Sequence, residues 1–168
     1  MSILLRTVHG SHLYGLSKPG SDLDYYVVID GKNKKVNKQT IVNGVDTNVV
    51  CLDTFLSLCQ KGVPQALEAL YSPYATVDEI PYIRHTFYAH GSVVESTYRR
   101  TIKNFWDDRR GMDTFKVRRH ALRLMLNLKD IREYGKIYPV LSIEQISLIS
   151  GLALRENGRE ILERKLYG

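Results

Sequence analysis

The sequence of 168 residues lacks the features that define several protein classes. It has two cysteines, Cys51 and Cys59, whose spacing matches neither a CxxC pair nor a zinc-ligand motif. We therefore expect reduced thiols and a cytoplasmic location, not a disulfide scaffold or a cysteine-based zinc finger. No apolar run approaches the roughly 20 residues that span a bilayer, and residues 1–6 are too soon charged for a signal peptide. We therefore expect no membrane partner.

Charge is unevenly distributed along the chain. Hydrophobic residues make up 43% of the sequence and charged residues 25%, which argues against wholesale disorder. Residues 1–80 hold seven Lys/Arg against eight Asp/Glu, whereas residues 81–168 hold seventeen against ten. A cationic second half is typical of a chain that binds nucleotide phosphates or RNA, and it is equally typical of a solvated helical surface.

Apolar periodicity and turn signals predict strands first and helices afterwards. Strands are expected over residues 2–8, 23–29, 40–42 and 45–52, with a polar turn over 31–35 and a hairpin at Asn43-Gly44. Helices are expected over 54–61 (capped by Asp53), 65–71, 86–106, 114–134 and 159–166, and one more opens at Ser142. The order predicts an α+β fold. A small mixed β-sheet backed by helices forms a lobe over residues 1–80, and a basic helical region over 81–168 packs on that lobe.

Three aspartates in the first half predict a cation site. Asp22 and Asp24 are two residues apart on a predicted strand, so alternation puts both carboxylates on one face. Asp46 opens the second strand of the hairpin and can lie beside them in an antiparallel or mixed sheet. Carboxylates held together repel one another unless cations lie between them. Their oxygens suit Mg²⁺, and a pair of such ions stabilises the attacking and leaving oxygens of phosphoryl transfer.

Gly10-Ser11 provides the complementary feature, a place for phosphate. A glycine lets the backbone approach an anion closely, and a helix that begins there directs free N–H groups and its positive end at the same point. The Ser11 hydroxyl adds one more donor, and Gly15 allows the short helix to end sharply. Each of these features alone is common in ordinary turns. Together with the three aspartates they indicate a site for a nucleotide and its metals.

Basic residues of the second half form two further candidates. Lys116, Arg119, His120 and Arg123 share one helical face. This face either lines a cleft opposite the carboxylates, where it holds phosphates or base, or is a solvated stripe with His120 at the edge of the core. The other candidate is an RNA-facing patch made of Arg99, Arg100 and Lys103.

One acidic residue, Glu68, stands in the apolar segment 66–70, where we expect it to make a structural hydrogen bond or ion pair. Tyr14 is expected either to pack in the core or to stack on a base.

The motifs resemble those of a known superfamily. Gly10-Ser11, a gap of ten residues, Asp22-x-Asp24 and an isolated strand Asp46 are similar to the DNA polymerase β-like nucleotidyltransferases. More narrowly, Gly10-Ser-His-Leu-Tyr-Gly15, the helix–Gly–x–Pro–helix segment over 55–73 and Lys116-x-x-Arg119-His120-Ala-Leu-Arg123 resemble the predicted nucleotidyltransferases associated with RNA repair. Val63 stands where that group has a small polar residue, a departure that concerns a helix junction and not the chemistry.

The resemblance implies an enzyme with two Mg²⁺ ions, or Mn²⁺, and a nucleoside triphosphate such as ATP as substrate. By that resemblance Gly10 and Ser11 bind the triphosphate, and Asp22 and Asp24 bind both metals. Asp46 then completes the catalytic metal site and helps to deprotonate the attacking hydroxyl. The expected reaction transfers a nucleoside monophosphate to a hydroxyl, above all on RNA such as a tRNA 3′ end, and releases pyrophosphate. Two alternatives remain open: a protein adenylyltransferase of the toxin–antitoxin type, and a nucleic-acid-binding module without catalysis.

Overall fold

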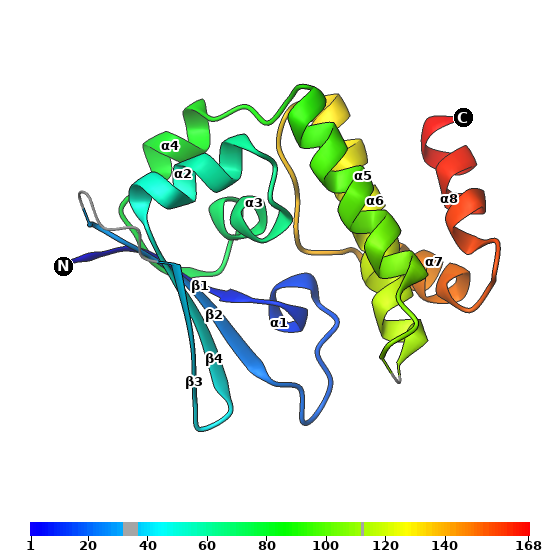
Figure 1. The fold of residues 1–168 in the computed structure, drawn as a ribbon, viewed down its shortest axis with the longest axis horizontal. Helices are drawn as coiled ribbons and strands as arrows, with labels where there is room; N and C mark the ends of the chain where they lie inside the picture. Colours follow the sequence, from blue (N-terminus) through cyan, green and yellow to red (C-terminus); the bar gives the residue numbers. More distant parts are fainter. Residues whose placement is uncertain (32–36, 112) are drawn as a thin grey trace.

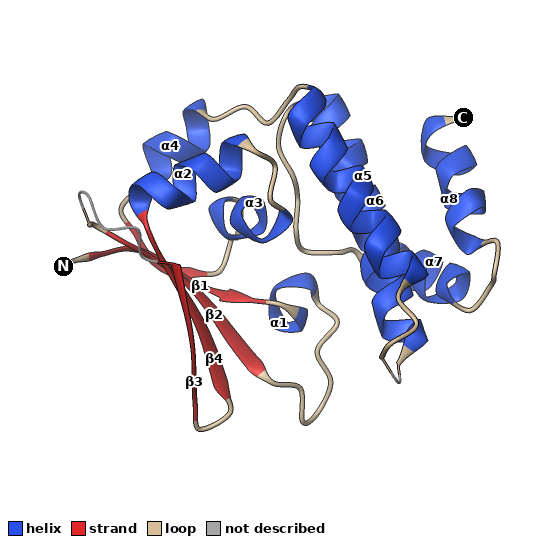
Figure 2. Cartoon of the chain, in the orientation of Figure 1, coloured by secondary structure: helices blue, strands red, loops and turns tan. Residues whose placement is uncertain are grey.

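The structure, a computed structural model, describes residues 1–31, 37–111 and 113–168. Five strands form one mixed sheet in the order β3-β4-β2-β1-β5, in which β2 and β4 are parallel and the other neighbouring strands are antiparallel. The strands are β1 (Ile3–His9), β2 (Leu23–Ile29), β3 (Asn37–Val42), β4 (Val45–Cys51) and β5 (Ala75–Asp78). Figure 2 shows the strands gathered at one end of the molecule with short helices above them, and longer helices at the other end. The predicted α+β fold with a mixed sheet is confirmed.

Local turn chemistry accounts for the position of the β3–β4 hairpin. The β3–β4 hairpin turns at Asn43 and Gly44, whose φ angles of 51° and 75° are those that favour these two residue types. β5 was not predicted, because it has only four residues and is defined by its pairing with β1. The polar turn predicted over 31–35 lies, apart from Gly31, outside the described residues.

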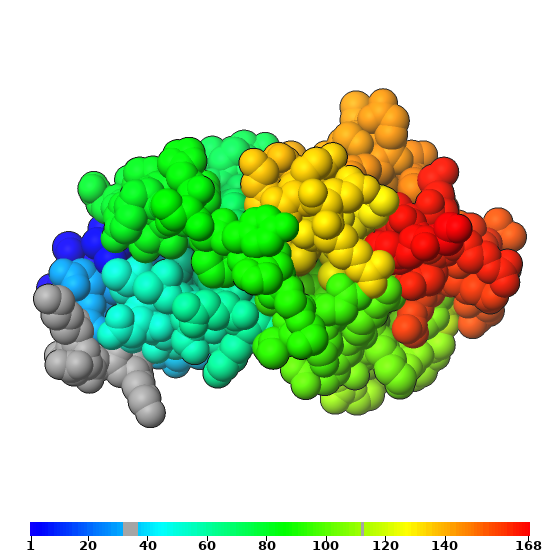
Figure 3. Space-filling model, turned by 90° about the horizontal axis from the view of Figure 1, so that it is seen from above, coloured from blue at the N-terminus to red at the C-terminus, as the bar shows by residue number. Residues whose placement is uncertain are grey.

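Eight helices are described. Four are short and follow the strands of the first half: α1 (Ser11–Tyr14), α2 (Leu52–Gln60), α3 (Pro64–Leu70) and α4 (Pro81–Thr86). Four more make up the rest of the chain: α5 (Ser92–Asp107), α6 (Thr114–Tyr134), α7 (Ile143–Ala153) and α8 (Gly158–Tyr167). In Figure 1, α5 and α6 lie side by side, with α7 and α8 beyond them. Figure 3 places α7 and α8 at the end of the molecule opposite the N-terminus.

Two helix boundaries differ from the sequence-based prediction. The single helix predicted over 86–106 is wrong, because Phe87 has extended backbone and Gly91 has a φ of 95°, which separate α4 from α5. Asp53 is not a helix cap, because α2 begins at Leu52 directly after β4 and leaves Asp53 in its first turn. The capping box at Ser142 is confirmed, with reciprocal hydrogen bonds between Ser142 and Gln145.

One continuous hydrophobic core joins the sheet to the long helices. It includes Leu5 of β1, Tyr26 of β2, Phe55 of α2 and Leu124 of α6, all at most 2% exposed. Gly62 allows close packing at this junction, since an added Cβ would lie 2.8 Å from the backbone of Val94 on α5. None of the described helices has the length and apolar character needed to cross a membrane.

Candidate active site

The sheet register brings two of the predicted aspartates side by side. In the parallel pair β2–β4, Asp24 lies directly opposite Asp46, and in the antiparallel pair β1–β2, His9 lies directly opposite Asp24. Residues paired in this way project from the same face of a sheet. Asp22 lies two residues before Asp24, just ahead of β2, and its charge acts on the Asp24 carboxyl. Asp46 is therefore on the same face of the sheet as Asp24, as expected from the sequence.

The aspartates are electrostatically coupled and incompletely satisfied. Burial raises the pKa of Asp24, and the neighbouring Asp46 and Asp22 carboxylates raise it further against the opposing effects of His9 and His12. Asp46 Oδ2 accepts a hydrogen bond of 2.6 Å from Gln39 Nε2. Asp46 Oδ1 is buried and has no hydrogen-bond partner within the described part of the chain. A cation would satisfy this oxygen and relieve the repulsion between the carboxylates.

The donor chemistry at this point fits Mg²⁺. Hard carboxylate oxygens are the ligands that Mg²⁺ takes, usually one or two of them together with water and substrate phosphate oxygens. Among residues 1–31, 37–111 and 113–168, no three His, Cys, Asp or Glu side chains already surround a common cation position. The protein alone therefore offers an incomplete ligand set, which phosphate oxygens of a bound nucleotide would extend.

The Gly10-Ser11 corner lies against these carboxylates. Gly10 joins β1 to α1 with a φ of 65°, and a Cβ added there would lie 2.5 Å from Asp24 Oδ2, so any other residue would strain the backbone and displace that carboxylate. The N–H groups of Ser11 and His12 donate to no acceptor in the described residues, because the first amides of α1 that bond back to Gly10 are those of Leu13 and Tyr14. Backbone donors and a hydroxyl therefore converge beside Asp24 and are available to an anion.

A cavity of about 900 Å³ opens between this corner and the long helices. Gly10, Ser11, Asp22 and Asp24 line one side, together with the loop over residues 18–21. The opposite side is formed by α5 and α6, and the floor by the start of α3. Asp46 lies next to Asp24 but outside this lining. A volume of this size is within the range of small-molecule sites, so the cavity has room for a nucleotide.

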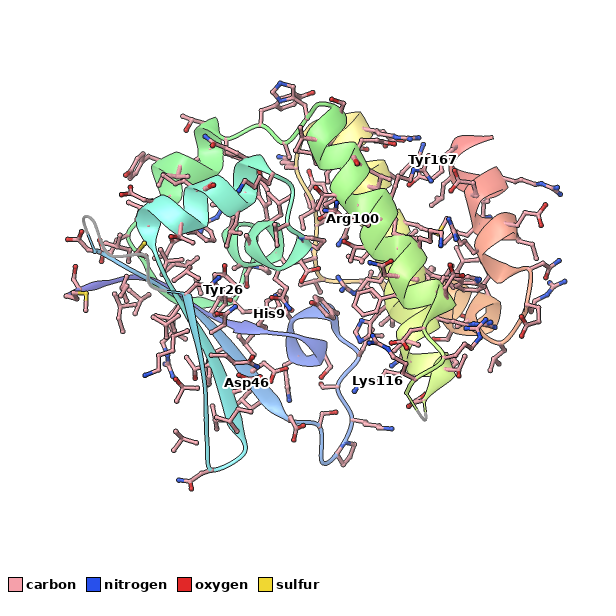
Figure 4. All side chains as sticks on the ribbon, viewed as in Figure 1. His9, Tyr26, Asp46, Arg100, Lys116 and Tyr167 are labelled. Atoms are coloured by element: carbon pink, nitrogen blue, oxygen red, sulfur yellow. The ribbon has the colours of Figure 1, made fainter. Side chains whose placement is uncertain are left out.

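All four predicted basic-stripe residues face the cavity from α6. In Figure 4, Lys116 lies beside the N-terminal end of α6, across from His9 and Asp46 on the sheet. Lys116 and Arg119 have no carboxylate partner among the described residues, and Arg119 lies 5.0 Å from the centre of the Phe115 ring. The interpretation of a cleft-lining stripe is therefore favoured over that of a solvated one.

The comparison with known families agrees with this geometry. Over residues 1–168 the sequence matches the family described as RlaP, the RNA repair pathway DNA polymerase beta family. The chain belongs to this family. The resemblance drawn from the Gly-Ser and aspartate motifs is thus confirmed, and the RlaP family links the chain to polymerase β-like nucleotidyltransferases and to RNA repair. No curated protein was found to match the sequence.

The other two stripe residues differ from Lys116 and Arg119. The Arg123 guanidinium is buried and lies 2.6 Å from Glu68 Oε1, so a carboxylate already neutralises it. Burial and the nearby Arg123 lower the pKa of His120 to about 3, which leaves this imidazole uncharged at neutral pH. Of the four residues predicted to hold phosphates or base, two, Lys116 and Arg119, therefore remain as cations without a carboxylate partner in the described part of the chain.

A buried cluster centred on Glu68 fixes the Gly10-Ser11 corner. Glu68 Oε2 accepts a hydrogen bond of 2.5 Å from the Tyr14 hydroxyl and lies 3.1 Å from His9 Nε2. His9 directly precedes Gly10, and Tyr14 ends α1, so one carboxylate contacts both flanks of the corner. The Arg123 guanidinium covers the Tyr14 ring at 3.6 Å. Burial opposes ionisation of Glu68, but Arg123, His9 and Tyr14 outweigh it and lower the pKa to about 2.

The sequence signalled part of this cluster. Glu68 is the single charged residue in an apolar segment, and its predicted ion pair is confirmed. Nothing in the sequence indicated that Gln39 would bond to Asp46, because β3 contributes it from a neighbouring strand. The side chains of Phe105 on α5 and Gln65 on α3 also line the cavity and were not predicted, since helix packing brings them there.

The second basic patch is largely neutralised. Arg99 forms an ion pair of 2.8 Å with Glu163, and Lys103 forms one of 2.9 Å with Asp107. Within the described residues, only Arg100 of the three predicted patch members has no carboxylate partner. The expectation of an RNA-facing patch made of all three cations is therefore not supported.

Proposed function

We propose that the chain is a Mg²⁺-dependent nucleotidyltransferase that transfers a nucleoside monophosphate from an NTP to a hydroxyl of RNA, such as a tRNA 3′ end. The observation that carries the proposal is the register that sets Asp24 beside Asp46, on the face where Gly10 closes against Asp24. The RNA acceptor is supported by the family's link to RNA repair and by the cationic second half.

The residues divide the reaction between them. Gly10 and Ser11 bind the triphosphate through backbone and hydroxyl donors, and Lys116 and Arg119 neutralise it from the other wall. Residues 1–80 thus supply the carboxylates, and residues 81–168 supply the cations. Asp22, Asp24 and Asp46 would hold the metal, which would supply stabilisation of charge on the attacking and leaving oxygens.

Proton and bond changes follow from this arrangement. Asp46 lies beside Asp24 at the proposed metal site, and its carboxylate is the group that accepts the proton of the acceptor hydroxyl. The acceptor oxygen then forms a bond to the α-phosphorus, and the bond from that phosphorus to the bridging oxygen breaks. Pyrophosphate leaves with the negative charge, which Lys116 and Arg119 stabilise.

Label transfer tests the proposal. The full chain is incubated with each of four α-³²P-labelled NTPs, with Mg²⁺ or Mn²⁺, against total RNA and against protein. Label is expected on RNA, and the double variant Asp22→Asn/Asp24→Asn is expected to lose it while remaining folded. Asp53→Asn is the matched control, because Asp53 is an exposed aspartate of α2 outside the cavity.

Each alternative has its own outcome in this experiment. Label on a protein band in place of RNA would identify a protein adenylyltransferase. RNA binding that is insensitive to Mg²⁺ and NTP, with no pyrophosphate release, would identify a binding module. Equal transfer by the double variant would remove the catalytic assignment of Asp22 and Asp24.

A further inference from the structure

The cavity wall opposite the carboxylates has a neutral aromatic part as well as a cationic one. His120 of α6 and Phe105 of α5 both line the cavity, and their ring centres are 6.0 Å apart with planes inclined by 36°. On its other side, His120 meets the Tyr14 ring edge-on at 6.1 Å. Tyr14 is itself held by Glu68, so the position of the imidazole is fixed by its neighbours on both sides.

His120 has hydrogen-bonding capacity that the protein does not use. Within the described part of the chain neither of its ring nitrogens has a hydrogen-bond partner. A neutral imidazole carries one N–H donor and one nitrogen acceptor. Because burial and Arg123 disfavour the charged ring, this side chain presents one donor and one acceptor to the cavity and no positive charge.

These properties exclude two roles for His120. An uncharged ring adds little to the binding of a triphosphate, for which Lys116 and Arg119 are available on the same helix. A ring that resists protonation is also a weak general base for a hydroxyl. What remains is recognition of a flat, neutral, hydrogen-bonding group, which is the chemistry of a nucleobase.

We propose that the nucleobase of the NTP lies against the Phe105–His120 face of the cavity and that His120 hydrogen-bonds to its edge and determines which NTP is preferred. The inference rests on the proposed function, because it takes the NTP as the occupant of the cavity. Gln65, exposed at the start of α3, also lines the cavity and offers a further amide to the same ligand. Lys116 and Arg119 serve the phosphates, so base and phosphate recognition depend on different residues of α6.

A comparison of NTPs with inorganic tripolyphosphate separates the two kinds of recognition. Dissociation constants are measured by calorimetry for the four NTPs and for tripolyphosphate in the presence of Mg²⁺. His120→Phe keeps an aromatic ring and removes both ring nitrogens. It is expected to weaken the preferred NTP about tenfold, to reduce the differences among the four NTPs, and to leave tripolyphosphate within about twofold. Lys116→Ala, the matched control, is expected to weaken tripolyphosphate and all four NTPs by similar factors.

A second variant covers the case in which His120→Phe does not fold. Phe105→Leu keeps an apolar side chain and removes the flat ring, and it is expected to give the same loss that is specific to NTPs. The inference is overturned if the variants leave the NTP affinities unchanged or weaken tripolyphosphate as much as the NTPs. If the unaltered chain binds neither NTP nor tripolyphosphate, the proposed function falls as well. If the unaltered chain binds both and transfers label but the variants show no loss specific to NTPs, only the role of His120 is refuted.

Discussion

The hydrogen bond between Tyr14 and Glu68 offers a direct test of how the phosphate-binding corner is held. Tyr14→Phe removes one hydroxyl, the donor of the 2.5 Å bond to Glu68 Oε2, and keeps the ring that Arg123 covers. A hydrogen bond to a buried charged group contributes about 2 kcal/mol to stability. We expect the free energy of unfolding, measured by urea titration, to fall by about that amount.

The same substitution should also weaken nucleotide binding. Without the bond, the C-terminal end of α1 is no longer tied to Glu68, and binding of the triphosphate must order the corner. If all of the lost stabilisation, about 2 kcal/mol, were drawn from binding, the dissociation constant would rise roughly 30-fold, so we expect a rise between about threefold and 30-fold. Calorimetric titration with the preferred NTP measures it.

Tyr98→Phe is the matched control for this prediction. Tyr98 is a fully buried tyrosine of α5 whose hydroxyl has no hydrogen-bond partner in the described residues. Removing that hydroxyl breaks no bond, so stability should not fall and NTP affinity should stay within about twofold. The reasoning is refuted if Tyr14→Phe lowers stability and yet binds the NTP as tightly as Tyr98→Phe does.

Three further predictions follow from other contacts. Gly10→Ala should lower transfer activity at least about 100-fold, because the added Cβ meets the Asp24 carboxylate. Gly44→Ala is the control, because Gly44 has a similar φ but open space around it. This variant should lose only about 1 kcal/mol of stability. Gln39→Leu should weaken Mn²⁺ binding several-fold in a spectroscopic titration, since the third aspartate loses its donor. Relative to that of His120→Phe, the free energy of unfolding of the unaltered chain should fall by about 2 kcal/mol between pH 6.5 and 4.5, because His120 binds a proton in the unfolded chain but only near pH 3 when folded, whereas Asp130, whose pKa is raised to about 6, titrates in both proteins. The free energy of unfolding itself should fall again from pH 4.5 toward 2, because the pKa of Glu68 is lower in the folded protein than in the unfolded chain.

Local chemistry explains which parts of the fold could be predicted from the sequence. Asn43-Gly44 determines its own backbone angles, and Ser142 and Gln145 cap the helix that they begin. The alternation of Asp22 and Asp24 is likewise a property of neighbouring residues. The place of Asp46 depends on the register between distant strands, because a one-residue shift between β2 and β4 would put it on the other face of the sheet.

Packing between distant segments explains what could not be predicted. In the sequence, Arg123 is one of four equivalent basic residues on a helical face. In the structure it forms an ion pair with Glu68, 55 positions earlier, so its charge is already neutralised. His120 reads in the sequence as a residue that could hold either phosphates or base, and only its burial between Phe105 and Tyr14 shows that it is uncharged. The periodicity of α6 thus identified the face that lines the cavity but not the electrostatic role of each residue on it.

The composition of the Glu68 cluster itself argues for a positioning role. A buried ion pair is often no more stabilising than well-packed apolar residues of the same volume. Stability alone therefore does not account for the buried Glu68–Arg123 pair beside the Gly10-Ser11 corner. Apolar contacts are also non-directional, whereas the two oxygens of Glu68 accept directed hydrogen bonds from Tyr14 and Arg123, and His9 Nε2 lies 3.1 Å from Oε2. These three residues come from β1, α1 and α6, the elements that carry the phosphate-binding corner and the cationic wall. A single carboxylate thereby links the two walls of the cavity, between which the proposed nucleotide would lie.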